Sequence, residues 1–464
     1  MRFRFPLSWV RSVAALLVLG SPALAQRCVA PTVPAATLSG PTPPVDVCFP
    51  ASRSGSPFLI EYFDDFSWRN FIAMVWPAAA GQRGKPDVIK SVGSPGPRVF
   101  ETFKSPWEVF HADGSPPSSQ NFDDYEAATY NSCNATAQFG GELVLTSVNK
   151  FDDIAQAGFG VQVSPLPDQT GHYVRYNTHY SRPEFTMIYN KRWYLKSQLP
   201  AGGTGQPAQA FPSGSISVKS AWIDMTPYTT AQRSRFYTTQ AAIRDPSAPS
   251  APCRHVTVGL VGLHIVAKTP SRPQWIWSTF DHVDNVPPPS SGRTFNDGLA
   301  TTMPPSSPIS FPPPPPEPAP HFNIDRLKPI FSSGIVSTVA TNAAYQSLLA
   351  GTVWANYQLV MTQYPVRNGM DAKPVPVNQD GTPPNTFPGP SNPNSGFANP
   401  VMETFLQQNV STGCMNCHNF ARQATDFVYS IATHAYAPPP ADSSRPLPVR
   451  FELVALRNLL QSIR

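Results

Sequence analysis

Charged residues are scarce in this sequence. Asp, Glu, Lys and Arg make up 14% of its 464 residues, against a typical share of about 25%. The formal net charge is only +5, and no run of Lys and Arg interleaved with aromatic residues occurs. Nucleic-acid-binding proteins usually carry such a basic patch. We therefore expect no nucleic acid partner.

Long apolar runs are scarce too. The apolar run nearest the N-terminus, residues 13–19, follows three arginines and precedes Ala23-Leu24-Ala25. It is much shorter than the ~20 residues of a membrane span, so an N-terminal membrane anchor is the weaker alternative. A basic start, a short apolar centre and an Ala-x-Ala ending are typical of a cleavable secretory signal. We expect cleavage after Ala25, a periplasmic or secreted protein, and no membrane span in the mature chain.

Proline, in contrast, is abundant. The 56 prolines are more than twice the usual share of about 5%. Many lie in residues 26–57, which we interpret as an irregular lead-in, and in residues 286–320. Proline fixes φ and lacks an amide donor, so the second segment is expected to be an extended linker or a surface strap.

The chain between these two segments, residues 58–285, predicts an α+β fold. Asp64 is a suitable cap for a helix that Pro77 would end, and a second helix is expected over 184–195. Alternating or β-branched runs predict three neighbouring antiparallel strands with at least one packed face. These runs are residues 216–222, 255–266 and 274–280.

Residues 321–464 are expected to form a helical segment that packs against the strands. Helices are predicted near 341–350, 399–408 and 451–463, with an irregular stretch over 366–398. The predicted divisions are a leader (1–25), a lead-in (26–57), a strand-rich region (58–285), a linker or strap (286–320) and this helical segment.

Six cysteines are present, and two of them belong to the motif described below. The other four are Cys28, Cys48, Cys133 and Cys253. An even number in an oxidising compartment suggests two disulfides, and four cysteines allow three pairings. We favour Cys28–Cys48, which would tie down the proline-rich lead-in, and Cys133–Cys253 by elimination.

The candidate functional motif is Cys414-Met415-Asn416-Cys417-His418. It matches C-x-x-C-H, the attachment signature of c-type haem. Two thiols on one helical turn can each bond one vinyl group of a porphyrin, and the adjacent imidazole can then ligate the iron. We expect one covalent haem c, with Cys414 and Cys417 as the attachment residues and His418 as an axial ligand.

Other interpretations of the motif fit less well. A zinc ribbon needs four ligands, and the sequence has no second Cys pair to complete one. A thioredoxin-type pair would follow a strand of an α/β unit and would lack the adjacent histidine. A disulfide between Cys414 and Cys417 would be strained.

The sixth iron ligand is not defined by the sequence. No methionine follows Met415, so we expect upstream residues to enclose the haem. The candidates are His264, His282, His434 and Met361, with Met402 as a further upstream methionine. Three of them have a plain alternative: His264 as a hydrogen-bonded core residue, His282 as a locally bonded loop residue and Met361 as core filler. His434 precedes a proline-rich loop, a place where ligands do occur.

Three segments resemble a group of uncharacterised exported bacterial proteins of the cytochrome c family. They are residues 68–77, residues 261–285, and the motif at 414–418 with Thr425-Asp426-Phe427 beyond it. The resemblance spans most of the mature chain. It implies haem binding and redox activity, but no substrate and no catalytic residue.

These observations favour an exported monohaem cytochrome in electron transfer or redox sensing. Its partner would be a redox protein or a small-molecule substrate. Two alternatives stay open, and they leave open whether the protein is an enzyme. One is a peroxidase- or oxidase-like haem enzyme with an open distal site, and the other is a ligand-binding module with an accessory haem.

Overall fold

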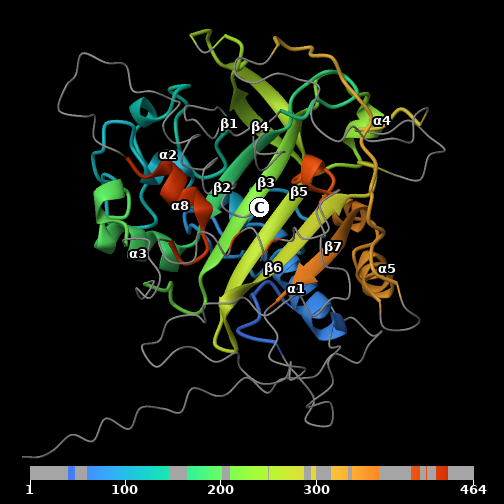
Figure 1. The fold of residues 1–464 in the computed structure, drawn as a ribbon, viewed down its shortest axis with the longest axis horizontal. Helices are drawn as coiled ribbons and strands as arrows, with labels where there is room; N and C mark the ends of the chain where they lie inside the picture. Colours follow the sequence, from blue (N-terminus) through green and yellow to red (C-terminus); the bar gives the residue numbers. More distant parts are fainter. Residues whose placement is uncertain are drawn as a thin grey trace, which may run out of the picture.

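A computed structural model describes residues 40–47, 60–145, 165–200, 209–248, 250–286, 294–298, 315–332, 337–364, 399–407, 414, 418 and 425–436. The expected leader, Cys28, Cys48, Cys417 and the expected helix over 451–463 lie outside the described residues. Helices and a mixed sheet together give the α+β fold that the sequence predicts (Figure 1).

A seven-stranded sheet forms the centre of the fold. All neighbouring strands run antiparallel except β1 and β4, which are parallel. Three strands, β3, β5 and β6, confirm the predicted runs. The strands are β1 (Leu143–Leu145), β2 (Arg175–Tyr180), β3 (Ile216–Asp224), β4 (Thr238–Ile243), β5 (Arg254–Thr269), β6 (Arg272–His282) and β7 (Tyr357–Gln363).

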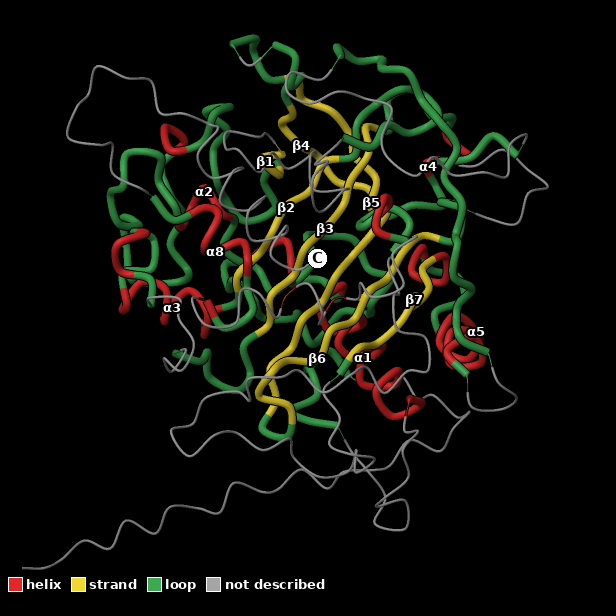
Figure 2. Tube along the Cα trace, viewed as in Figure 1, coloured by secondary structure: helices red, strands yellow, loops and turns green. Residues whose placement is uncertain are grey.

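The long strand β5 divides the sheet into two branches. β3 pairs along one of its edges, whereas β4 and then β6 share the other edge. β1 continues the sheet from β4, and β7 continues it from β6, as Figure 2 shows. At the branch point Trp222 pairs with Leu260 but Ala221 pairs with Gly262. Val261 is therefore an extra residue, and such a bulge reverses the side on which later side chains of a strand lie.

Helices surround the sheet. α1 and α5 lie beside β7, whereas α2, α3 and α8 gather near β2 (Figure 1). The α-helices are α1 (Ile60–Val75), α2 (Pro106–Val109), α3 (Arg182–Lys191), α4 (Thr230–Arg233), α5 (Thr338–Leu348) and α8 (Tyr429–His434), with single 3-10 turns at Phe100–Thr102, Ala128–Tyr130, Lys196–Gln198, Val353–Asn356 and Thr404–Leu406.

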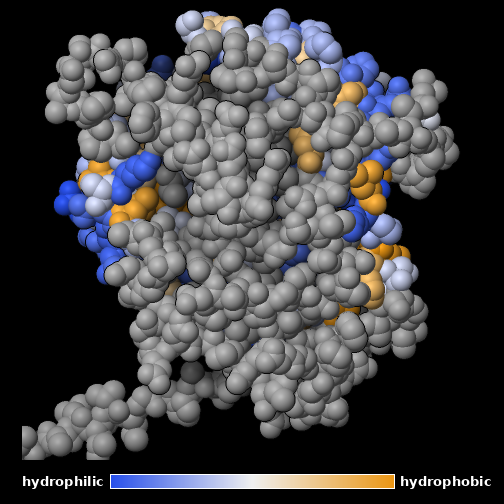
Figure 3. Space-filling model, viewed as in Figure 1, coloured by the Kyte–Doolittle hydropathy of each residue, from blue (hydrophilic) through white to orange (hydrophobic). Residues whose placement is uncertain are grey.

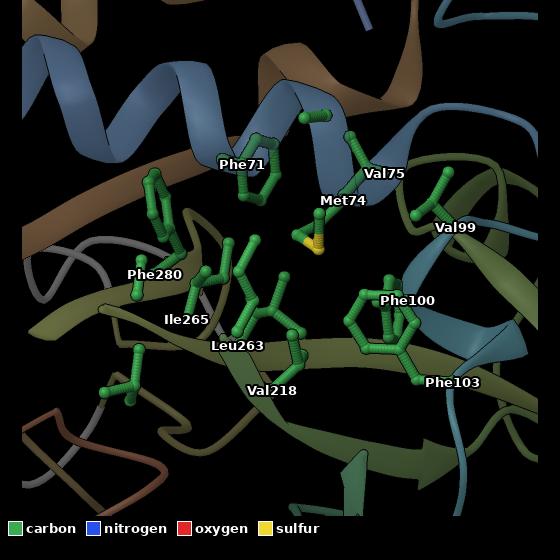
Figure 4. Close-up of a cluster of buried hydrophobic side chains, with 14 of the residues drawn as sticks. Phe71, Met74, Val75, Val99, Phe100, Phe103, Val218, Leu263, Ile265 and Phe280 are labelled. Atoms are coloured by element: carbon green, nitrogen blue, oxygen red, sulfur yellow. The ribbon is translucent and has the colours of Figure 1, made fainter. Parts of the chain in front are cut away.

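α1 covers one face of the sheet and closes the main core. Figure 4 shows Phe71 and Met74 of this helix above Val218 of β3 and Leu263 of β5. Phe71 also stacks on Phe280 of β6, with ring centroids 4.5 Å apart. Burying a side chain of this size contributes roughly 1.5–3 kcal/mol, so this face is a principal source of stability.

Asp64 does not cap α1, and that prediction is wrong. The helix begins at Ile60, so Asp64 lies inside it. Its carboxylate is fully buried and accepts hydrogen bonds from the hydroxyls of Thr338 (2.7 Å) and Thr362 (2.8 Å). Asp64 therefore joins α1 to α5 and β7, which lie beyond the proline-rich segment.

The predicted helix over 184–195 is shorter and starts earlier. A capping box between Ser181 and Glu184 starts α3 at Arg182. Arg192 adopts the left-handed conformation, with φ of 55°, and ends the helix after Lys191.

The helices predicted after the proline-rich segment have mixed outcomes. The helix predicted over 341–350 is confirmed as α5. A helix over 399–408 is not: the described residues 399–407 form turns with one 3-10 turn. The side-chain oxygen of Asn399 accepts hydrogen bonds from the backbone N–H groups of Val401 and Met402. This local bonding competes with a regular helix.

The described part of the second proline-rich segment packs as a strap. The Glu317 carboxylate lies 3.0 Å from the guanidinium groups of Arg175 and Arg254. The Tyr173 hydroxyl donates a hydrogen bond of 2.9 Å to the carbonyl of Pro315. Residues 315–317 are therefore fixed to the ends of β2 and β5.

Cys133 and Cys253 form a disulfide, which confirms this pairing. The bond ties the loop before β1 to the residue preceding β5. No helix in the described parts of the chain has the length and hydrophobicity needed to cross a membrane. Figure 3 shows hydrophilic and hydrophobic residues side by side at the rims of one face of the molecule.

Candidate functional site

Four side chains form a row across the sheet, on the face opposite α1. The register pairs Lys219 of β3 with His264 of β5, His264 with Thr279 of β6, and Thr279 with Met361 of β7. Leu263 points toward α1 (Figure 4), and successive side chains of a strand alternate, so His264 points the other way. Adjacent strands lie about 4.8 Å apart, which separates His264 from Met361 by about 10 Å.

Residues 399–407, which we call the cover segment, lie on this face beside β5 (Figure 1). The side-chain nitrogen of Asn399, which is fully buried, donates a hydrogen bond of 2.9 Å to the hydroxyl of Thr279. Gly262 allows the close approach, because a Cβ there would lie 2.9 Å from the sulfur of Met402 and 3.1 Å from a methyl group of Val401.

The cover segment brings Glu403 to the row. Oε1 of Glu403 lies 2.9 Å from Nε2 of His264. Burial raises the pKa of Glu403, but the charges of His264 and Lys219 lower it, and the net shift is downward. Nε2 of His264 is buried and faces this carboxylate. Nζ of Lys219 lies 5.1 Å from the centre of the Tyr176 ring, a cation–π distance.

His418 lies over the same face. Its ring is 4.2 Å from that of Trp277 of β6 and 5.2 Å from that of Tyr429 of α8. Nδ1 of His418 lies 2.7 Å from the carbonyl oxygen of Phe427. A carbonyl only accepts, so Nδ1 carries the hydrogen and Nε2 carries the lone pair. Burial lowers the pKa of His418 to about 4, which keeps the ring neutral at neutral pH.

The backbone that presents the Phe427 carbonyl is strained. Asp426 and Phe427 have φ angles of 48° and 71°, in the left-handed region that costs a residue with a side chain roughly 1–2 kcal/mol. Both residues are fully buried. Strain of this kind persists where the surroundings over-determine the conformation, often at functional sites.

No protein-family profile, curated protein or solved structure matches the chain. The chemistry of the site must therefore be argued from its own residues. In the described parts of the chain, no group of three or more His, Cys, Asp or Glu residues is arranged to hold a metal ion. A covalent haem needs fewer protein groups, because the porphyrin supplies four of the iron ligands and the attachment motif supplies the rest of the anchorage.

The residues present fit a haem in two respects. Cys414 is half-buried against the main core and lies four positions before His418, hence on the same helical face. Nε2 of His418 has the tautomer that binds iron, because Nδ1 carries the hydrogen. Cys417 lies outside the described residues.

The structure separates His282 from this site. Its Nε2 lies 3.0 Å from the carbonyl of Arg235, and its Nδ1 lies 3.1 Å from the backbone nitrogen of Asp284. The ring is fully buried and stacks on Phe236 at 3.8 Å. Both ring nitrogens are thus used within the fold, in keeping with a locally bonded residue.

His434 and Met361 are placed differently. His434 is the last residue of α8, with Nδ1 2.6 Å from the carbonyl of Ser430 and its ring 5.8 Å from Phe110. Met361 is buried at the β7 end of the row, beyond Thr279. Of the four predicted candidates, His264 has its buried Nε2 in the row beside Glu403, on the face that His418 covers.

Sequence reasoning missed Lys219, Glu403 and the Asp426–Phe427 turn as parts of the site. The sequence does hint at Lys219, because this charged residue alternates with apolar neighbours on a predicted strand. It gives no hint of Glu403, because the segment around that residue predicts a helix. Trp277 lay within a segment that supported the family resemblance, but no role was assigned to it.

Proposed function

We propose that this chain is an exported monohaem c-type cytochrome that acts in electron transfer or redox sensing. The observation that carries the proposal is the hydrogen bond from Nδ1 of His418 to the carbonyl of Phe427. A histidine that ligates a metal almost always donates its other N–H to a carbonyl, a carboxylate or water. The haem, once bound, supplies a one-electron iron couple.

Each site residue has a proposed role in binding the haem. Cys414 and Cys417 would hold the porphyrin covalently, and His418 would offer a neutral Nε2 to the iron. Trp277 and Tyr429 pack against the His418 ring, which stays partly exposed. We propose His264 as the second histidine that would hold the iron, because its Nε2 is buried on the same face as His418 and would exchange its 2.9 Å contact with Glu403 for the metal.

The attachment is tested by expressing the full chain with haem-attachment machinery. The denatured protein should keep its haem stain on a gel and give a c-type pyridine haemochrome. The Cys414→Ser/Cys417→Ser variant should lose both signals while the far-UV circular dichroism stays unchanged. Stain that persists in this variant would contradict the proposal, and so would a wild-type chain without haem.

The sixth ligand is tested by absorption spectra with and without carbon monoxide. The wild type should be low-spin in both oxidation states, and its ferrous form should not bind carbon monoxide. His264→Ala should become high-spin and bind carbon monoxide, because it opens one iron position. The matched variants His434→Gln and Met361→Leu should keep the wild-type spectrum. A wild type that already binds carbon monoxide would favour a haem enzyme or gas sensor instead.

A further inference from the structure

A second group of residues fixes the turn that holds His418. Nζ of Lys268, near the end of β5, forms a buried ion pair with the Asp426 carboxylate. The same carboxylate accepts a hydrogen bond of 2.7 Å from the backbone N–H of Phe211. The indole N–H of Trp275 donates a hydrogen bond of 2.9 Å to the backbone carbonyl of Asp426. We call Lys268, Trp275 and Asp426 the Asp426 anchor.

The anchor holds a backbone that would not otherwise stay in place. Two successive residues, Asp426 and Phe427, are left-handed, and Trp275 itself has a φ of 74°. A turn released from the anchor would relax toward ordinary φ values and move the Phe427 carbonyl. Because Nδ1 of His418 donates to that carbonyl, the imidazole would lose its acceptor.

We infer that the Asp426 anchor is the positioning element for His418, and that it sets the reduction potential of the haem. This inference rests on the proposed function. A strong acceptor at Nδ1 makes the imidazole a more basic ligand, and a more basic ligand favours ferric over ferrous iron. Loss of the anchor should therefore raise the reduction potential.

For Lys268, a positioning role and a simple charge effect predict opposite changes in the reduction potential. Removing the negative charge of Asp426 would raise the potential by electrostatics alone, whereas removing the positive charge of Lys268 would lower it or leave it unchanged. Positioning predicts a rise in both cases. Trp275→Phe removes a neutral donor and no charge, so it should raise the potential through position only.

The experiment is potentiometric titration of the haem-loaded full chain. We expect Asp426→Asn, Lys268→Met and Trp275→Phe each to shift the ferric/ferrous equilibrium about tenfold toward the ferrous form, which is about 59 mV for one electron. Lys268→Arg should restore most of the wild-type value. The matched control is Trp222→Phe, which removes a buried indole hydrogen bond to Ser220 elsewhere in the core. It should leave the reduction potential unchanged. Opposite shifts in Asp426→Asn and Lys268→Met would overturn the inference, as would an unchanged potential in Trp275→Phe.

A second measurement separates this inference from the proposed function. Nitrogen-15 NMR of the His418 imidazole reports which nitrogen carries the hydrogen, with or without haem. The wild type should show the Nδ1–H form, and Trp275→Phe should show a mixture. A wild-type chain without haem refutes the proposed function, yet the NMR still decides the positioning role. The same tautomer in wild type and Trp275→Phe would show that the anchor does not position His418.

Discussion

Nε2 of His264 lies 2.9 Å from Oε1 of Glu403, although the two residues come from opposite sides of the proline-rich strap. The central strand supplies the imidazole, and the cover segment supplies the carboxylate. Tyr176 of β2 holds the cover segment as well, through a hydrogen bond of 2.6 Å from its hydroxyl to the carbonyl of Val401. The face opposite α1 is therefore built from both halves of the chain.

The close approach of the cover segment to β5 predicts that Gly262→Ala is destabilising. The new Cβ would lie 2.9 Å from the sulfur of Met402, and overpacking of this kind costs about 1–3 kcal/mol. Denaturant unfolding measures the loss. Gly40→Ala is the matched control, because nothing lies within 4 Å of its Cβ position. Met402→Ala should cost less stability in the Gly262→Ala background than in the wild type, and equal stability of Gly262→Ala and wild type would contradict the contact.

The buried Asp64 predicts a pH-dependent stability. Burial raises the pKa of Asp64 to about 7, so the folded chain keeps a proton that the unfolded chain releases above about pH 4. The folded state binds more protons in this window, and stability therefore falls as the pH rises from about 4 to 7. At 1.36 kcal/mol per pKa unit, this group alone accounts for a loss of up to about 4 kcal/mol.

Asp64→Asn isolates that effect. The amide does not ionise, so the variant should gain stability relative to the wild type as the pH rises from 4 to 8. Urea unfolding at several pH values measures the difference. Buried Glu184, whose pKa burial raises to about 8, contributes in the same direction, so the comparison must be between the two proteins and not between pH values. A difference that does not change with pH would refute the raised pKa of Asp64.

The strap predicts unequal roles for two arginines that contact Glu317. Arg175 is buried, with 2% side-chain exposure, whereas Arg254 is 45% exposed. Arg175→Ala leaves the buried carboxylate without its main partner and should cost about 3–5 kcal/mol. Arg254→Ala should cost less than Arg175→Ala, because Arg254 is 45% exposed, although it also lies 3.2 Å from the buried carboxylate of Asp224. Thermal or urea unfolding distinguishes the two, and similar losses would contradict this account of the strap.

The Cys133–Cys253 bond predicts a redox-sensitive stability. It closes a loop of 120 residues, and removing a disulfide typically costs about 2–5 kcal/mol. Cys133→Ala/Cys253→Ala should unfold at lower urea concentration than the wild type. Mass spectrometry after thiol labelling without reductant should find neither cysteine labelled in the wild type. Labelling of both would refute the bond.

The strands could be predicted because their residues carry a direct local signal. Alternating and β-branched runs predict β3, β5 and β6. They do not predict β7, because its apolar run lies between segments with helical patterns. The alternation of side chains along the strand predicts the wrong face for His264. His264 lies an even number of positions from Val258 and Leu260 in the sequence, but the bulge at Val261 places it on the opposite face from them. A bulge leaves no clear trace in hydrophobic periodicity.

Only the site residues that belong to the C-x-x-C-H motif could be predicted from the sequence. Spacing identified Cys414, Cys417 and His418 as candidates, since their chemistry depends on neighbouring positions. Glu403 and Lys268 reach the site through tertiary contacts with residues far away in the chain. Asp426 belongs to a segment that carries the family resemblance, but its spacing indicates no role. Such contacts depend on how the sheet and the cover segment pack, and no local pattern encodes them.

The link from Asp64 to Thr338 and Thr362 has a consequence for how the chain folds. α1 is synthesised first, but its packing partners in α5 and β7 emerge about 280 residues later. Until then its apolar side, with Phe71 and Met74, has no complete surface to cover it. Contacts of such long range slow folding and leave intermediates prone to aggregation. We therefore expect truncated chains that end before Tyr364 to depend on chaperones, and the full chain to fold late and cooperatively because α1 needs β7.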